Sequence, residues 1–152
     1  MLLQHEADRQ IAAAKFIILR PYHGTTSIAN GIDFRTGIDL IYRVSTTDLS
    51  RSFYMDLTRP HRNARKLKLQ LRASTMEILV RLNVSGAAHR NPDGTRLGGT
   101  HIHLYRRGED DDWAYSLNPV DFSNPSNPLM TFLEFCRYCH IDTVPLAGRV
   151  HV

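Results

Sequence analysis

The sequence predicts a single α+β domain over residues 1–152: a mostly antiparallel sheet of about five or six strands, with an N-terminal and a C-terminal helix packed on one face. Two runs in which apolar and polar residues alternate, 66–72 and 78–84, predict paired strands with one buried face. Apolar residues spaced by three and four near both ends of the chain predict the helices. With 42% hydrophobic residues, the chain can bury one core.

The first helix is expected over Leu2–Leu19. Its apolar stripe stops where Arg20 precedes Pro21, and a residue before proline disfavours the helical conformation. Residues 22–37 are rich in Gly, Thr, Ser and Asn and predict a loop, with a short extended piece at 32–34.

Strands are expected at 38–44 and 52–57, which are rich in β-branched and aromatic residues, and then in the two alternating runs. In the second run the expected inward residues are Ile78, Val80, Leu82 and Val84, and the expected outward residues are Leu79, Arg81 and Asn83. Arg81 then shares a face with the basic side chains of the first run.

The C-terminal part predicts a further strand at 113–117 and a proline-rich loop at 118–128. Ser126 is the expected N-cap of a closing helix, with Pro128 in its first turn and an end near His140.

The formal charge of +4 is unevenly distributed, because basic residues gather between Arg51 and Arg72 while acids gather at 109–112. A basic band can bind RNA or an acidic protein or nucleoprotein partner, and the alternative is an ordinary solvated strand face. The residues expected to contact a partner are Arg59, Arg62, Arg65, Lys66, Lys68, Arg72, Arg106 and Trp113.

The composition also predicts where the protein acts. The sequence contains no run of about 18 uncharged apolar residues and no export signal at its start, so we expect a cytoplasmic protein without a membrane contact. Two cysteines do not make a disulfide framework.

The stretch 89–113 contains the unusual residues. His101 and His103 alternate along an expected strand and leave the same face, together with Tyr105. The turn 91–94, Asn-Pro-Asp-Gly, folds the chain back so that His89 approaches the other two imidazoles.

Three interpretations of this histidine cluster are open. As acid and base, His101 and His103 cleave RNA, with His89 assisting, Arg81 holding phosphate and Tyr105 stacking on a base. As ligands, the three imidazoles hold a divalent metal; this is the minority interpretation, and no cofactor is expected otherwise. As structural residues, they only bond to the backbone.

Two further motifs match known sites by their letters. His23-Gly24-Thr25 is similar to one element of the two-histidine phosphoesterases, but only one copy occurs. The run 136–140, Cys-Arg-Tyr-Cys-His, matches a c-type haem attachment site, yet it lies at the end of an expected packing helix, so a buried thiol at Cys136 is the better interpretation, with Cys139 partly exposed.

Several spaced motifs lie between Phe53 and Ile141. They are Arg81-Leu82-Asn83, Gly86, His89, Asn91-Pro92-Asp93-Gly94, His101-Ile102-His103-Leu104-Tyr105, Trp113-Ala114 and Phe135-Cys136. On these residues the chain resembles a family of short, uncharacterised bacterial and prophage proteins. The resemblance implies a related fold and carries no activity.

A second likeness is to the TumE-type toxins of bacterial toxin–antitoxin pairs, which place a Pro-His turn before a His-containing strand. This chain departs from the pattern, because no Pro-His dipeptide directly precedes its His-containing strand. The likeness implies growth arrest through RNA, and with it we expect a metal-independent ribonuclease that has a cognate antitoxin. The alternative is a non-catalytic binding protein, for example a phage-encoded inhibitor of a host defence complex such as CRISPR-Cas, that uses its basic sheet face.

Overall fold

The computed structural model describes residues 1–23, 32–143 and 150–151 of the chain. The elements are α1 (Gln4–Ala12), β1 (Lys15–His23), β2 (Ile32–Asp33), β3 (Ile38–Thr46), β4 (Ser52–Arg59), β5 (Leu67–Ala73), β6 (Ile78–Val84), β7 (His89–Arg90), β8 (Arg96–Leu97), β9 (His101–Leu104), β10 (Ala114–Tyr115), α2 (Pro128–Tyr138), β11 (Ile141–Asp142) and β12 (Val150–His151). Neither of the described helices combines the length and the apolar character needed to cross a membrane.

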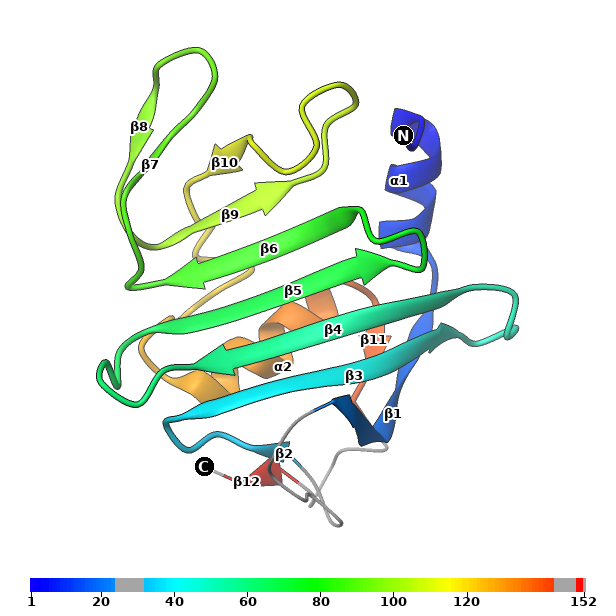
Figure 1. Ribbon diagram of the computed structural model, residues 1–152, viewed down its shortest axis with the longest axis horizontal. Helices are drawn as coiled ribbons and strands as arrows, with labels where there is room; N and C mark the ends of the chain where they lie inside the picture. Colours follow the sequence, from blue (N-terminus) through cyan, green and yellow to red (C-terminus); the bar gives the residue numbers. More distant parts are fainter. Residues whose placement is uncertain (24–31, 144–149, 152) are drawn as a thin grey trace.

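Eight strands form one sheet in the order β10-β9-β6-β5-β4-β3-β1-β11 (Figure 1). Neighbours are antiparallel except β1 and β11, which are parallel. Two pairs of short strands, β7 with β8 and β12 with β2, stand outside this sheet. The prediction of a single, mostly antiparallel α+β domain is confirmed, and the sheet is larger than expected because short strands extend both of its edges.

The core lies between the sheet and α2. Alternate residues of β3, β4 and β5 are buried, and Phe132, Phe135 and Cys136 of α2 pack with them. Figure 1 shows α2 behind the sheet and no helix in front of its central strands. The front face is therefore the polar one, and its side chains must satisfy one another or bind something else.

The helices differ from the prediction. The helix expected over Leu2–Leu19 ends at Ala12, because Lys15–His23 pairs as β1 with β3 and β11. α1 stands at the end of the sheet beside β6 (Figure 1), so α2 is the helix that packs on the sheet face. The N-cap of α2 is Asn127 rather than Ser126, and its side chain accepts from the Met130 N–H at 3.0 Å.

Two inward–outward assignments at the start of β6 were wrong. Ile78 was expected to face inward, but it is only half-buried. Leu79 was expected to face outward, but it is fully buried in the core. The register between β5 and β6 shifts between Leu71 and Arg72, so that Arg72 pairs with Ile78. The irregularity changes the alternation at the start of β6. Beyond it, Arg81 pairs with Gln70 and lies on the polar face as predicted.

Lys15 joins the C-terminal ends of the two helices. Its buried ammonium donates to the carbonyls of Ile11 and Ala13 at 2.7 Å and of Cys139 at 2.9 Å. Helix C-termini carry partial negative charge, so a cation there is favourable. Burial nevertheless lowers the pKa of Lys15 to about 8.

We expect Lys15→Met to lower the free energy of unfolding by about 2–4 kcal/mol, because three carbonyls lose a charged donor and the C-terminal ends of α1 and α2 lose their link. Lys66→Met, at an exposed position, is the matched control and should change it by less than about 0.5 kcal/mol. Urea unfolding measures both. Equal stabilities of the two variants would contradict this role for Lys15.

Candidate functional site

Two strands and a hairpin bring the three predicted histidines together. β9 pairs with β6, so that His101 lies opposite Asn83 and His103 opposite Arg81. The β7–β8 hairpin carries His89 back to them. The chain is held at the neck of this hairpin by a bond from the Gly86 N–H to the Gly99 carbonyl, 2.9 Å. A Cβ at Gly99 would collide with the Gly86 backbone, so glycine is required there.

Asn91 fixes the hairpin against the sheet edge. Its buried side-chain amide donates to the Ala114 carbonyl at 3.0 Å and its oxygen accepts from the Ala114 N–H at 2.8 Å. The Asn-Pro-Asp-Gly turn itself is present: Gly94 has a φ of +90° and its N–H donates to the Asn91 carbonyl. The first residue of the turn motif thus also links β7 to β10.

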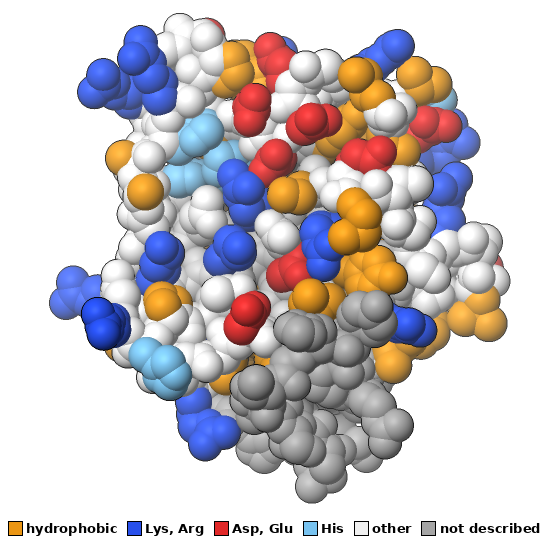
Figure 2. Space-filling view, in the orientation of Figure 1, with side chains coloured by type: hydrophobic (Ala, Val, Ile, Leu, Met, Phe, Trp, Pro, Cys, Tyr) orange, Lys and Arg blue, Asp and Glu red, His pale blue; other side chains and the backbone are white. Residues whose placement is uncertain are grey.

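The three imidazole rings are in mutual contact. The ring centroids of His89 and His103 are 4.6 Å apart, those of His101 and His103 4.8 Å, and those of His89 and His101 5.6 Å. His101 and His103 are each 1% exposed, whereas His89 is half-buried. Figure 2 shows a group of histidine side chains on the polar face, at the end of the sheet next to the hairpin.

Main-chain carbonyls determine the tautomers of the rings. A carbonyl only accepts, so Nδ1 of His101 donates to Gly98 at 2.6 Å and Nδ1 of His103 donates to Asp111 at 2.7 Å. Nε2 of each neutral ring is then an acceptor, and it lies 3.3 Å from the side-chain nitrogen of Asn83 or Arg81, respectively.

His89 bonds through its other nitrogen, Nε2, to the Asp112 carbonyl at 2.7 Å. The acidic loop therefore supplies backbone acceptors to the cluster from two consecutive residues, Asp111 and Asp112. This contact holds the half-buried ring of His89 against the two buried ones.

Burial keeps the strand imidazoles neutral. Burial, together with the positive charge of Arg81, lowers the pKa of His103 to about 4. Burial also lowers the pKa of His101, with smaller contributions from His89 and Arg81. At neutral pH both rings can accept a proton only at an energetic cost.

The arrangement does not favour the metal interpretation. Within residues 1–23, 32–143 and 150–151, no group of three His, Cys, Asp or Glu side chains is arranged to hold a metal ion. The physical reason is that Nε2 of His101 and of His103 each face a nitrogen donor from β6, and the donor facing His103 is a cation.

Arg81 connects the cluster to the acidic loop and the sheet. Its Nη1 pairs with the Asp111 carboxylate at 2.5 Å while Nη2 faces His103. A second polar group follows on the same face: Arg72 binds the Asp56 carboxylate through two nitrogens, at 2.6 and 2.9 Å, and Gln70 donates to it at 2.7 Å. Arg81 is thus engaged in the structure rather than free to hold phosphate as predicted.

Two predicted aromatic residues do not join the site in the expected way. Tyr105 is buried in the core and its hydroxyl donates to the Leu2 carbonyl at 2.6 Å, because β9 ends at Leu104 and the next residue packs beside α1. Trp113 is half-buried beneath the guanidinium of Arg106, which lies 4.3 Å from the ring centroid. Neither Tyr105 nor Trp113 therefore presents an open ring for stacking on a base.

The predicted basic residues divide into two groups. Arg59 is buried and its guanidinium donates to the carbonyls of Phe34 and Ala64, so a partner cannot reach it, and Arg72 is held by Asp56 and lies over the Tyr54 ring. Lys68 is half-buried on the polar face. The exposed members are Arg62, Arg65 and Lys66, in the loop between β4 and β5, and Arg106, whose guanidinium lies over the Trp113 ring.

The prediction missed one basic residue that the hairpin makes conspicuous. Arg96 is exposed and pairs directly with Arg90 across β7 and β8. The signal was present in the sequence, because a tight turn centred on Pro92-Asp93-Gly94 places flanking residues opposite each other.

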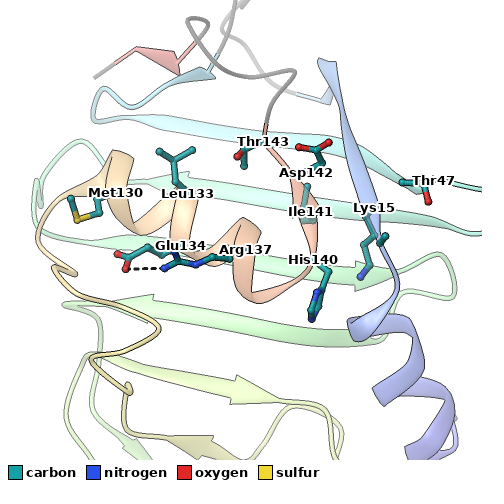
Figure 3. Close-up of a pocket in the computed structure, with 11 residues that line it drawn as sticks. Lys15, Thr47, Met130, Leu133, Glu134, Arg137, His140, Ile141, Asp142 and Thr143 are labelled. Carbon is teal, nitrogen blue, oxygen red and sulfur yellow. Dashed lines mark ion pairs between the residues drawn. The ribbon is translucent and has the colours of Figure 1, made fainter.

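A cavity of about 630 Å³ lies elsewhere, between α2, β1 and β11 (Figure 3). Met130 and Leu133 of α2 line it with the Glu134–Arg137 ion pair, 3.6 Å. Lys15 also lines it, but its ammonium is already bonded to three carbonyls. The cavity therefore offers no available amine, and it does not include the histidine cluster.

The remaining motifs are placed as follows. Cys136 and Cys139 are free, fully buried thiols whose pKa values burial raises; this agrees with the expectation for Cys136, whereas Cys139 was expected to be partly exposed. The His23-Gly24-Thr25 motif falls outside the described residues at Gly24 and Thr25.

We expect the free energy of unfolding to decrease as pH falls from about 6.5 to about 4. The pKa of His103 is near 6.5 in an unfolded chain and about 4 in the folded one, so the unfolded chain binds an extra proton within this window. The stability that results from the lowered pKa of His103 is fully present above about pH 6.5. The loss should be on the order of 2 kcal/mol after allowance for solvent screening.

Urea unfolding over this pH range measures the loss, and His103→Gln should reduce it. His5→Gln, at an exposed position on α1, is the control and should leave the wild-type profile unchanged. A profile of His103→Gln that runs parallel to the wild type would show that His103 is not the titrating group.

Comparison with known proteins adds one finding. No curated protein and no solved structure matches the chain. A family model described as a family of unknown function, DUF6978, matches residues 2–141, which include both helices and the whole histidine cluster. The chain therefore belongs to the DUF6978 family.

Proposed function

We propose that the protein binds nucleic acid through a basic edge, which we define as Arg62, Arg65, Lys66, Arg90 and Arg96. All five side chains are exposed. They come from the β4–β5 loop and the β7–β8 hairpin, which lie at the same end of the sheet (Figure 1), and Lys and Arg side chains follow this side of the molecule in Figure 2.

The pairing of Arg90 with Arg96 is the observation that carries the proposal. Like charges directly opposite each other on paired strands destabilise them. A phosphate bound between the two guanidinium groups would turn this repulsion into two charge-assisted hydrogen-bonding contacts. The pair therefore destabilises the free protein, and a bound anion would remove this destabilisation.

Charge balance supports the same proposal. The ion pairs found among the described residues use Arg72, Arg81 and Arg137, and none uses a member of the basic edge. In the β9–β10 loop, the Asp111 carboxylate pairs with Arg81 at the cluster instead. The basic edge thus keeps a positive field that attracts a polyanion.

The surroundings favour nucleic acid over an acidic protein. Protein interfaces usually have an apolar centre. Among the described residues, the exposed large apolar side chains lie outside 61–68 and 86–99, the two segments that form the basic edge. The toxin-like and the defence-inhibitor interpretations both involve RNA-containing targets, so this surface would serve either.

RNA cleavage is the second candidate, favoured by the contact among the three imidazoles. An acid and a base are needed, and a general acid must be protonated at the working pH. Burial lowers the pKa of both His101 and His103, so neither ring is protonated at neutral pH to serve as the acid. Binding therefore stands as the first proposal and cleavage as the second.

We expect Arg90→Gln combined with Arg96→Gln to weaken binding of a labelled RNA by at least about tenfold at low salt, with a smaller dependence of the affinity on salt concentration because two phosphate contacts are lost. The same variant should be slightly more stable than the wild type, by a few tenths of a kcal/mol, because the repulsion is removed. Fluorescence anisotropy and urea unfolding measure the two effects.

The control is Arg51→Gln, an exposed arginine at the other end of β4. It should change neither quantity. Absence of binding by the wild-type protein to RNA and DNA alike, together with capture of an acidic protein by the same surface, would replace nucleic acid by protein as the partner.

Cleavage is tested by incubating RNA with the wild type and with His89→Ala, His101→Ala and His103→Ala, each with and without a chelator. If the second candidate holds, cleavage survives the chelator and is reduced at least about 100-fold in the variants, since general acid–base groups contribute that much. Intact RNA with a folded wild-type protein would exclude it, and loss with the chelator would indicate a metal.

A further inference from the structure

We infer that the nucleic acid bound at the basic edge is single-stranded, and that one of its unpaired bases stacks on the ring of His89. This inference rests on the proposed function. It assigns a purpose to the histidine cluster that requires no proton transfer.

The ring of His89 is suited to stacking by its exposure and its support. It is half-buried, whereas the two imidazoles beneath it are almost fully buried. Its centroid lies 4.6 Å from that of His103, with the rings nearly perpendicular at 76°, and Nε2 is held by the Asp112 carbonyl at 2.7 Å. The ring is therefore held in place before any ligand binds, and histidine rings stack on unpaired bases in RNA-binding proteins.

The cluster is also neutral where a base would lie. Burial and Arg81 disfavour protonation of His103, and the Asp111 carboxylate is neutralised by Arg81. Arg81, the cation beside His103, is already paired with Asp111, while Arg90, which has no ion-pair partner among the described residues, follows His89 directly in the chain. Phosphate would thus bind at the charged arginines of the hairpin, and a base would bind at the neutral histidine cluster.

The geometry of the hairpin favours a single strand over a duplex. Successive residues of a strand point to opposite sides, so His89 and Leu97 lie on one side of the hairpin and Arg90 and Arg96 on the other. A nucleotide that contacts both sides must extend its base away from its phosphate across the hairpin. An unpaired nucleotide can do this, whereas the bases of a duplex are stacked inside it.

The polar face of the sheet offers further contacts for the bound nucleic-acid strand. Lys66 lies beside the hairpin neck, with its Cε 3.8 Å from where a Cβ of Gly86 would be. From there Lys68, Asn83 and His101 form one row across three strands of the sheet. A nucleic-acid strand that continues from His89 along this row reaches the ammonium of Lys68 and the amide of Asn83, which suit phosphate and a base edge respectively.

The test compares a ten-nucleotide oligouridylate with a blunt RNA duplex of about the same length. The wild type should bind the single strand at least about fivefold more tightly. His89→Ala should weaken binding of the single strand about 5- to 30-fold and leave duplex binding unchanged, while His89→Phe, which keeps a ring, should stay within about threefold of the wild type. His5→Ala is the control for loss of an exposed histidine.

A second measurement uses the wild-type protein alone, so it does not depend on the folding of a variant. Oligouridylates in which one nucleotide at a time lacks its base should bind more weakly, by a similar factor, at one position. Equal affinity for the single strand and the duplex, with no effect of any missing base, would overturn the inference while leaving the basic edge intact. Failure of the proposed function would instead appear as no binding of either RNA and no effect of Arg90→Gln with Arg96→Gln.

Discussion

The structure depends on one constraint: α2 covers one face of the sheet, so the polar side chains of the other face must satisfy one another. Asp56 is buried on that face and is balanced by Arg72 and Gln70. Arg81 is balanced in the same way by Asp111 and by the neutral ring of His103. Buried polar groups that lack partners are costly, and this explains why the imidazoles occur as fixed, neutral rings within a network.

Much of the fold could be predicted from local pattern. The strict alternation in 66–72 and 78–84 predicted β5 and β6 and the side of the sheet on which Arg81 lies. The Asn-Pro-Asp-Gly turn predicted the return of His89 to His101 and His103, and the rings are indeed in contact. These features depend on residues close in sequence or on a period of two, which a single sequence displays directly.

The failures come from contacts between distant segments. Lys15–His23 continues the helical spacing of the residues before it, yet pairing with β3 and β11 makes it a strand, and no local pattern reveals those partners. Leu79 was misassigned because of a register shift that depends on β5. Arg59 looks like any surface arginine in the sequence, and only its bonds to the carbonyls of Ala64 and of the more distant Phe34 show that it is structural.

The double attachment of the hairpin has a consequence for recognition. The Gly86–Gly99 contact holds its neck and the side chain of Asn91 ties it to the backbone of Ala114, so the hairpin belongs to the same cooperative unit as the sheet. The backbone of the hairpin and the ring of His89 are then in place before docking, so the entropy lost on binding comes from the incoming chain and from the exposed side chains of Arg90 and Arg96. Affinity at such a surface is limited by these flexible groups and not by the hairpin backbone.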